Sequence, residues 1–171
     1  MPKRILETER LFLRELVPED APELAWVLCD RENMRFYRDP FDFASVEAWI
    51  QRNILRYRDH GFGLWALVLK AGDVFIGDCG LVPQIVDGDP ELEIGYHLNR
   101  QYQGLGYATE AAAGCIEHAF KVLGRARVIS LIRPEHTASR RVAERNDMTV
   151  EKETIFVGLP HLVYVRHSPY A

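Results

Sequence analysis

The chain has 171 residues, of which 47% are hydrophobic and 27% charged, and its formal net charge is −4 at pH 7. This composition is typical of a folded globular domain, and the acidic balance argues against the basic surface that nucleic-acid-binding domains usually carry. No apolar run approaches the roughly 18 residues of a membrane span, and no apolar segment follows the basic N-terminus. We therefore expect one cytoplasmic domain over residues 1–171, with no nucleic-acid and no membrane partner.

The first 61 residues predict a strand and two helices. The segment RLFLREL (10–16) alternates like a strand near a sheet edge. Residues 17–30 begin with a proline and acidic residues, which favour a helix N-terminus, and they carry an apolar stripe. A second helix is predicted over residues 45–61, with Ser45 as N-cap and Gly61 as C-terminal stop.

From residue 64 onward the period changes from helical to alternating. Three short β-rich runs, 64–70, 74–82 and 91–98, are separated by turns predicted at 71–73 and 87–90. Together they predict an antiparallel meander. The segment 108–123 has a wide apolar stripe with small residues at its start, so it predicts a helix that lies close on a sheet. Residues 126–132 predict a strand parallel to 91–98, reached by a right-handed crossover.

The last part of the chain predicts a helix over residues 137–147 and a closing hairpin over 150–167, with its turn at Gly158-Leu159-Pro160. Three cysteines, Cys29, Cys79 and Cys115, lie far apart in apolar segments. That spacing favours buried free thiols over disulfides or a metal site.

One segment, NRQYQGLGYATEAA (99–112), places two glycines between a strand and the best predicted helix. The first N–H groups of a helix have no partner within it, and together with the helix dipole they suit a bound anion. Glycines at 104 and 106 let a diphosphate approach the main chain without a Cβ in the way. The alternative reading is a plain turn that needs positive φ.

The spacing of these glycines distinguishes between known phosphate loops. A dinucleotide fold requires a third glycine where Thr109 stands, and a P-loop requires a Gly-Lys-Ser/Thr string that does not occur. The pattern that is present, with Gln103, Gly106 and Ala108 in the order [Q/R]-x-x-G-x-[G/A], resembles the acetyl-CoA pyrophosphate loop of the GCN5-related N-acetyltransferases (GNATs).

The resemblance extends over nearly the whole chain. The segments ETERLFLREL, HGFGLWALVLK, IGDCGL, ELEIGYHL, YQGLGYATEAA and ASRRVAERNDM resemble, in order and spacing, the ribosomal-protein N-acetyltransferases of the RimJ/RimL type. This implies an α/β fold with a mixed, mostly antiparallel sheet flanked by helices. A splayed pair of parallel strands in that sheet would hold acetyl-CoA.

The same resemblance implies contacts for each part of acetyl-CoA. The thioester and pantetheine arm would lie along Ile94, Gly95, Tyr96, His97 and Leu98. The diphosphate would lie on Gln103, Gly104, Leu105, Gly106, Tyr107, Ala108 and Thr109. Near the start of the helix 137–147, His136 and Ser139 would complete the cofactor contacts.

Acetyl transfer needs a neutral amine, a place for the negative charge that develops on the carbonyl, and a proton for the departing thiolate. At pH 7 the neutral form of a lysine costs roughly 4.6 kcal/mol, whereas that of an α-amine costs only about 1 to 1.4 kcal/mol. Period two places Glu91, Glu93, Gly95 and His97 on one strand face. Glu93 matches a glutamate beside the reacting centre of similar enzymes and is the candidate base, directly or through water. Glu91 is the reserve, and a solvated strand face is the alternative for Glu93.

Ser139 is the second candidate catalytic residue. It matches the serine of the family's N-x-x-S helix start and could donate to the leaving sulfur, although a contact with its own helix N-terminus is an equal alternative. His136 replaces the usual asparagine, and Asp147 the usual glycine. The tyrosine that many relatives use as general acid has no counterpart after this helix, so the identity of the acid stays open.

The sequence therefore predicts an N-acetyltransferase that moves acetyl from acetyl-CoA to a primary amine by direct attack in a ternary complex. The amine could belong to a protein N-terminus or to a small molecule, and a homodimer is left open. The alternative is a CoA-binding regulatory or interaction module without turnover. No metal is expected in either case.

Overall fold

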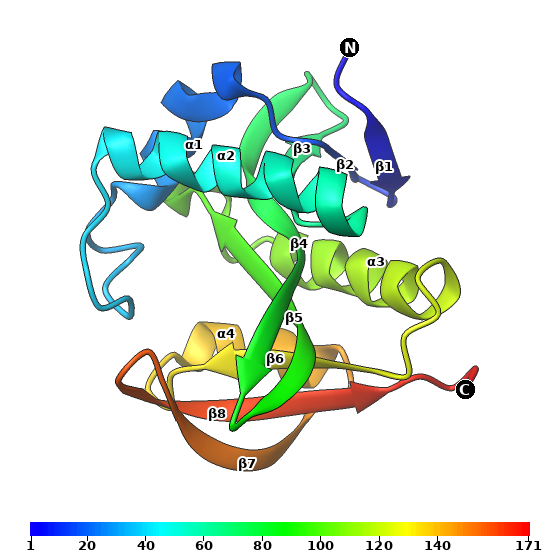
Figure 1. The fold of residues 1–171 in the computed structure, drawn as a ribbon. Helices are drawn as coiled ribbons and strands as arrows, with labels where there is room; N and C mark the ends of the chain where they lie inside the picture. The colour runs from blue at the N-terminus through cyan, green and yellow to red at the C-terminus, as the bar shows by residue number, and fades with distance from the viewer.

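The computed structural model describes residues 1–171 as one eight-stranded sheet with helices on both faces (Figure 1). The strand order is β1-β2-β3-β4-β5-β6-β8-β7. The strands are β1 (Arg4–Glu7), β2 (Leu11–Arg14), β3 (Leu64–Leu69), β4 (Val74–Val86), β5 (Asp89–Leu98), β6 (Arg127–Ile132), β7 (Thr149–Phe156) and β8 (Leu159–His167). The helices are α1 (Ala21–Leu28), α2 (Phe43–His60), α3 (Tyr107–Lys121) and α4 (Thr137–Arg145).

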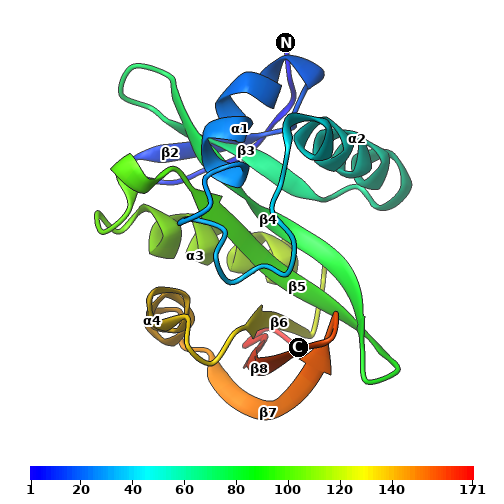
Figure 2. The same ribbon diagram turned by 90° about the vertical axis from the view of Figure 1, so that its left-hand side faces the viewer.

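Helices α1 and α2 cover one face of the N-terminal strands and α3 covers the other (Figure 2). The alternation of apolar residues explains this division, because successive side chains of a strand point to opposite faces. On β2, Phe12 packs with the α1 and α2 residues, whereas Leu11 and Leu13 join the larger cluster that contains α3. Both faces of these strands are therefore buried, which fixes the sheet between the helices.

The predicted meander and parallel crossover are both present, and they confirm the predicted fold class. Strands β3, β4 and β5 pair antiparallel in sequence order. Strand β6 pairs parallel to β5 with a single register pair, Glu93 with Ile129, beside which the Ser130 hydroxyl donates to the Ile94 carbonyl at 3.0 Å. Beyond this point the two strands diverge, and β6 pairs with β8 over its whole length.

Helix α3 begins at the glycine pair and lies close on the sheet. Gly104 and Gly106 have φ of +76° and +85°, a region that residues with a Cβ avoid, and Gly106 is the N-cap of α3. Within the helix, a Cβ on Gly114 would come within 3.0 Å of the Thr8 side chain. It would also come within 3.1 Å of the Leu6 side chain of β1. The small residues of α3 therefore permit the close packing on the sheet that their placement predicted.

One strand was missed and three local predictions were wrong. Strand β1, Arg4–Glu7, was not predicted. The β4–β5 turn is Asp87-Gly88 instead of 87–90, because Val86 already pairs with Asp89. The N-cap of α2 is Asp42 and not Ser45, because the Asp42 carboxylate accepts from the Ser45 N–H at 2.8 Å and the helix starts before the serine. The turn of the last hairpin lies at Val157-Gly158, both with positive φ, one residue earlier than predicted.

The three cysteines are free thiols. Cys79 and Cys115 are buried, as predicted, and their Sγ atoms lie 3.6 Å apart without a bond, whereas Cys29 is only partly buried. No helix has both the length and the apolar character needed to cross a membrane.

Candidate active site

The loop before α3 presents a row of unpaired main-chain donors. None of the six N–H groups from Gly104 to Thr109 donates to an acceptor of the protein, whereas the next one, of Glu110, donates to the Gly106 carbonyl. A Cβ on Gly104 would meet no atom within 4 Å, so the loop surface there is open. Six free donors at the positive end of a 15-residue helix form an anion cradle.

The segment before β2 holds this loop in place. Glu110, in the first turn of α3, accepts from the Thr8 hydroxyl at 2.7 Å and from the Arg10 N–H at 2.8 Å. The Arg10 guanidinium reaches the same carboxylate at 2.7 Å and also donates to the Leu105 carbonyl at 3.0 Å. These bonds fix the conformation of the loop against the segment before β2.

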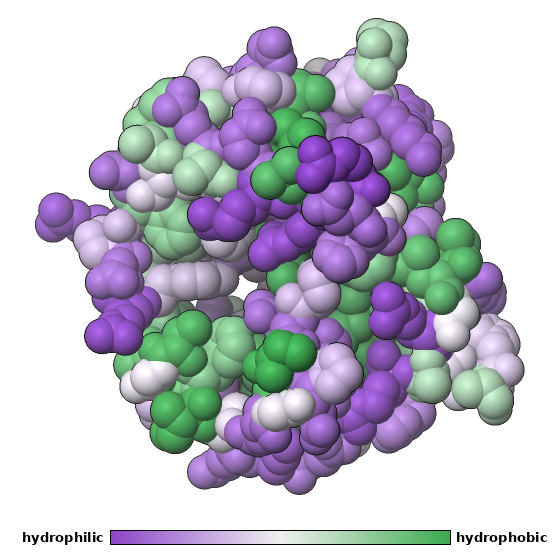
Figure 3. Space-filling model, in the orientation of Figure 1, coloured by the Kyte–Doolittle hydropathy of each residue, from purple (hydrophilic) through white to green (hydrophobic).

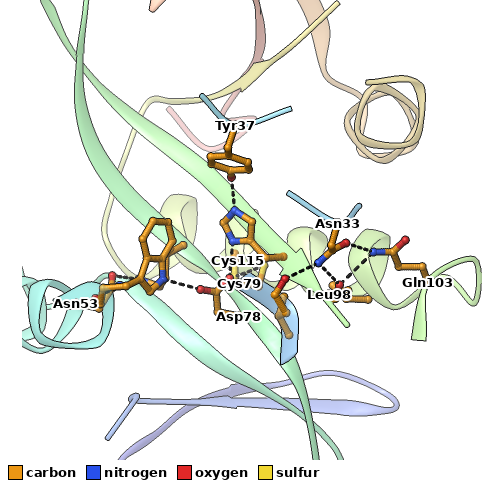
Figure 4. A network of polar contacts seen from close by, with 12 residues as sticks. Asn33, Tyr37, Asn53, Asp78, Cys79, Leu98, Gln103 and Cys115 are labelled. Carbon is orange, nitrogen blue, oxygen red and sulfur yellow. Dashed lines mark hydrogen bonds and ion pairs between the residues drawn. The ribbon is translucent and has the colours of Figure 1, made fainter. Parts of the chain in front are cut away.

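Gln103, which was predicted to contact the diphosphate, forms hydrogen bonds with the end of β5 and with the segment between α1 and α2. Its Nε2 group donates to the Asn33 side chain at 2.6 Å and to the Leu98 carbonyl at 3.1 Å (Figure 4). Asn33 donates to the same carbonyl at 2.9 Å. The end of β5 is thereby joined to the segment between α1 and α2.

Strand β5 has the two faces that its alternation predicted. Ile94 and Leu98 are buried in the core that contains α3, and Tyr96 packs against that core. Glu93 and His97 lie on the other face, toward α2. The strand therefore separates a hydroxyl-bearing side from a side with an acid and an imidazole.

Glu93 is a partly buried carboxylate at the point where β5 and β6 diverge. Gln84 donates to it at 3.1 Å, and burial raises its pKa above the usual range for a glutamate. The reserve candidate Glu91 is bound by the Arg127 guanidinium at 2.8 Å and 3.1 Å. Of the two glutamates, only Glu93 has a carboxylate without a cationic partner in hydrogen-bond contact.

On the other face, Tyr96 contacts Ser139 of α4. The two hydroxyls lie 2.9 Å apart, and the Tyr96 hydroxyl also donates to the Ser139 carbonyl at 3.1 Å. Burial raises the pKa of Tyr96, so the phenol keeps its proton at neutral pH. The Ser139 hydroxyl therefore reaches across to β5 instead of capping its own helix.

The capping role belongs to His136. Its Nδ1 atom accepts from the Ser139 N–H at 3.4 Å, and its ring stacks on Phe36 with centroids 4.1 Å apart. Burial, together with the charges of Arg35 and His97, lowers the pKa of His136 to about 4. The imidazole is therefore neutral and acts as a cap acceptor at physiological pH.

Sequence reasoning missed the partners of His97. Asp78 of β4 is fully buried and lies 2.7 Å from the His97 Nδ1 atom, while its other oxygen accepts from the Trp49 indole at 2.9 Å. The Tyr37 hydroxyl contacts the Nε2 atom of the same ring (Figure 4). A lone aspartate inside a predicted buried strand was the signal for this cluster, because a buried carboxylate needs partners.

The surface of the molecule is open close to β5. Figure 3 shows an opening through the molecule between the half that carries α2 and the half that carries α4. In the ribbon seen from the same side, the opening lies where β5 and β6 diverge (Figure 1).

Comparison with known proteins gives a consistent family. The acetyltransferase (GNAT) domain matches residues 10–149. The chain is 34% identical to the protein YkkB of Bacillus subtilis (strain 168), over 97% of both chains. It is 32% identical to the N-acetyltransferase p20 of Bacillus licheniformis, over 86% of this chain and 83% of that protein.

A solved structure with the same fold is RimL, a ribosomal L7/L12 alpha-N-protein acetyltransferase, in complex with coenzyme A. The two structures superimpose with a TM-score of 0.79 over 99% of this chain and 100% of RimL, at 20% identity. That likeness is one of fold. Because the domain match covers most of the chain and the identities above extend over most of its length, the chain belongs to the GNAT family of acetyltransferases.

Proposed function

We propose that this protein transfers an acetyl group from acetyl-CoA to a primary amine by direct attack within a ternary complex. One observation carries the proposal: six unpaired N–H groups, from Gly104 to Thr109, lie a few residues after a strand whose parallel pairing ends at Glu93. The N–H groups suit the diphosphate, and the main chain of β5 beyond Glu93 suits the amide-rich pantetheine arm. Acetyl-CoA presents both features in one molecule.

The two faces of β5 then divide the chemistry. The amine nitrogen attacks the acetyl carbon, the carbon–sulfur bond breaks, and the sulfur leaves as the thiol. The Ser139 and Tyr96 pair supports the proposal that the sulfur receives its proton on one face, since both groups are protonated donors. Glu93, on the opposite face, is the proposed base for the incoming ammonium, directly or through water.

The acceptor we propose is an α-amine, either of a protein N-terminus, as in RimJ/RimL-type enzymes, or of a small molecule. An α-amine costs only about 1 to 1.4 kcal/mol to neutralise at pH 7, against roughly 4.6 kcal/mol for a lysine. A single partly buried glutamate such as Glu93 is a sufficient base for the α-amine, because less free energy is needed to remove its proton.

The test is a screen of CoA release with acetyl-CoA and five amines: a peptide with a free N-terminus, an N-blocked peptide that contains lysine, spermidine, a free amino acid and an aminoglycoside. We expect the free N-terminus or the free amino acid to give the highest rate. Tight acetyl-CoA binding without CoA release from any amine would instead support the CoA-binding module. Absence of acetyl-CoA binding would contradict both.

A further inference from the structure

Three side chains from separate segments form a continuous hydrogen-bonded chain with His97 at its centre. Asp78, on β4, holds the Nδ1 atom at 2.7 Å. Tyr37, in the segment between α1 and α2, contacts Nε2. Asp78 has no exposed surface, while Tyr37 keeps 44% of its surface exposed, so the chain runs from the interior to the outside.

The carboxylate determines which nitrogen of His97 carries the proton. We assign the N–H of His97 to Nδ1, because this atom faces a carboxylate oxygen of Asp78 and a carboxylate oxygen accepts hydrogen bonds. In the neutral ring the Nε2 atom then has a free lone pair, and the Tyr37 hydroxyl donates to it. Nε2 is therefore a basic nitrogen with a fixed direction.

The ring is also held on its sides. Trp49 meets it edge-on with centroids 5.5 Å apart, and its indole N–H occupies the second oxygen of Asp78. Phe41 packs against both Trp49 and Tyr37. Asp78 and the ring are each held by more than one partner, and these contacts fix the direction of Nε2.

The proton balance of the reaction needs a second acceptor. A protonated primary amine carries three N–H protons and its acetamide product carries one, so the nitrogen loses two. The first must leave before attack, and the second leaves once the nitrogen–carbon bond has formed. The sulfur takes up one proton as the carbon–sulfur bond breaks, and one proton is released to solvent. Glu93 was assigned only the first of these losses.

We propose that His97 is a catalytic base of this site: its Nε2 atom accepts the proton that the amine nitrogen sheds after attack, while Asp78 is the positioning residue that orients the ring through Nδ1. The Tyr37 hydroxyl marks the place of the substrate N–H. The assignment rests on the acetyl transfer proposed above. It gives the face of β5 toward α2 two bases for the two protons, with Glu93 acting before attack and His97 after it.

Four titratable groups surround His97, and each comes from a different segment of the chain. Asp78 contacts Nδ1 from β4, and Glu93 lies four residues before His97 on the same face of β5. Tyr37 contacts Nε2 from the α1–α2 segment, and His136, at the start of α4, feels the charge of His97. A pH comparison must therefore include a Glu93 variant, so that the effects of the two bases are separated.

The first test measures CoA release with acetyl-CoA and the best amine of the screen, at pH 7 and pH 9. We expect His97→Gln to lower kcat about a hundredfold at both pH values, with the Kd of acetyl-CoA changed less than about twofold. Glu93→Gln should lose most at pH 7 and recover at pH 9, because free amine is then abundant. His60→Gln, at the exposed end of α2, is the control and should retain the wild-type kcat.

Two further measurements distinguish proton transfer from a structural role. Imidazole in the buffer should restore turnover of His97→Ala in a saturable way, and Tyr37→Phe should retain kcat within about threefold, since it frees Nε2. Nitrogen-15 NMR of the wild type should show the proton of neutral His97 on Nδ1. This last reading does not depend on whether any variant folds.

Several results would overturn the assignment. A His97→Gln enzyme within about threefold of wild type, failure of imidazole to rescue a folded His97→Ala, or a proton on Nε2 would each remove His97 from proton transfer. A fall in acetyl-CoA affinity as large as the fall in kcat would make it a cofactor contact. An inactive wild type would overturn the acetyl transfer itself, whereas an active wild type with an active His97→Gln would overturn only the role of His97.

Discussion

Replacing Trp49 with phenylalanine tests whether Asp78 is a buried carboxylate that depends on two donors. The substitution keeps an aromatic ring against Phe41 and His97 but removes the indole N–H, which donates to Asp78 at 2.9 Å. Asp78 has no exposed surface, so water cannot replace the lost donor. One oxygen of the carboxylate would be left unpaired in the interior.

The cost follows from that unpaired oxygen. A buried acceptor without a partner costs about 1 to 3 kcal/mol, and a charged one belongs in the upper half of the range. We therefore expect Trp49→Phe to lower the free energy of unfolding by about 2 kcal/mol. For a chain of this size that corresponds to a fall in Tm of about 4 to 8 °C. Thermal melts and urea titrations of the apo protein measure both quantities.

A matched control and a double variant sharpen the measurement. Trp26 is 73% exposed, so Trp26→Phe should change Tm by no more than about 2 °C. If the cost of Trp49→Phe arises from the carboxylate, it should shrink by at least about 1 kcal/mol when Asp78→Asn is already present. Equal Tm values for Trp49→Phe and Trp26→Phe, or full additivity with Asp78→Asn, would refute the reasoning.

Three further outcomes are expected. Acetyl-CoA should raise Tm whereas NAD should not, because only a ligand that binds the folded state stabilises it; equal shifts would contradict the diphosphate cradle. Arg10→Met should weaken acetyl-CoA binding severalfold in calorimetric titration, because Arg10 holds the Leu105 carbonyl, and an unchanged Kd would show that the loop needs no such anchor. Burial raises the pKa of Glu93 in the folded state, so its contribution to stability is lost as pH rises above the unfolded value of about 4.5. Glu93→Gln should therefore melt above wild type at neutral pH and level with it at pH 4, and a lower Tm at neutral pH would contradict this burial.

The fold was largely predictable because its clearest hydrophobic patterns extend over many residues. The meander and helix α3 are specified by many residues each, and the predicted crossover between β5 and β6 follows from their order. Strand β1 was missed because four residues carry too little pattern, and its place depends on β2 beside it. At α2, Asp42 and Ser45 are both residue types that favour an N-cap. Asp42 is the N-cap because its backbone is extended and the helix begins at the next residue.

Much of the cluster around His97 was also within reach of the sequence. The β4–β5 hairpin turns on two residues, Asp87 and Gly88, both with positive φ, as in the tight turns that favour Asp-Gly. This turn pairs Val86 with Asp89. Eight residues away from the turn along each strand, Asp78 therefore lies opposite His97. A four-residue turn was assumed, so the register stayed undefined. The contacts of Trp49 and Tyr37 could not be predicted in this way. Trp49 lies on a helix and Tyr37 in an irregular segment, so no strand register places either of them beside His97.

Strand β5 explains why an acid side and a base side can coexist in so small a site. Tyr96 and His97 are neighbours in sequence, yet the pleat directs one toward Ser139 and the other toward Asp78. In the proposed reaction, a proton is therefore given to the sulfur on one face of the strand and a proton is taken from the nitrogen on the other face. Donor and acceptor cannot neutralise each other by direct contact, because the strand backbone stands between them. Beyond Glu93, β6 no longer pairs with β5. In the proposed complex the thioester lies against that backbone, where it is the one group that both faces reach.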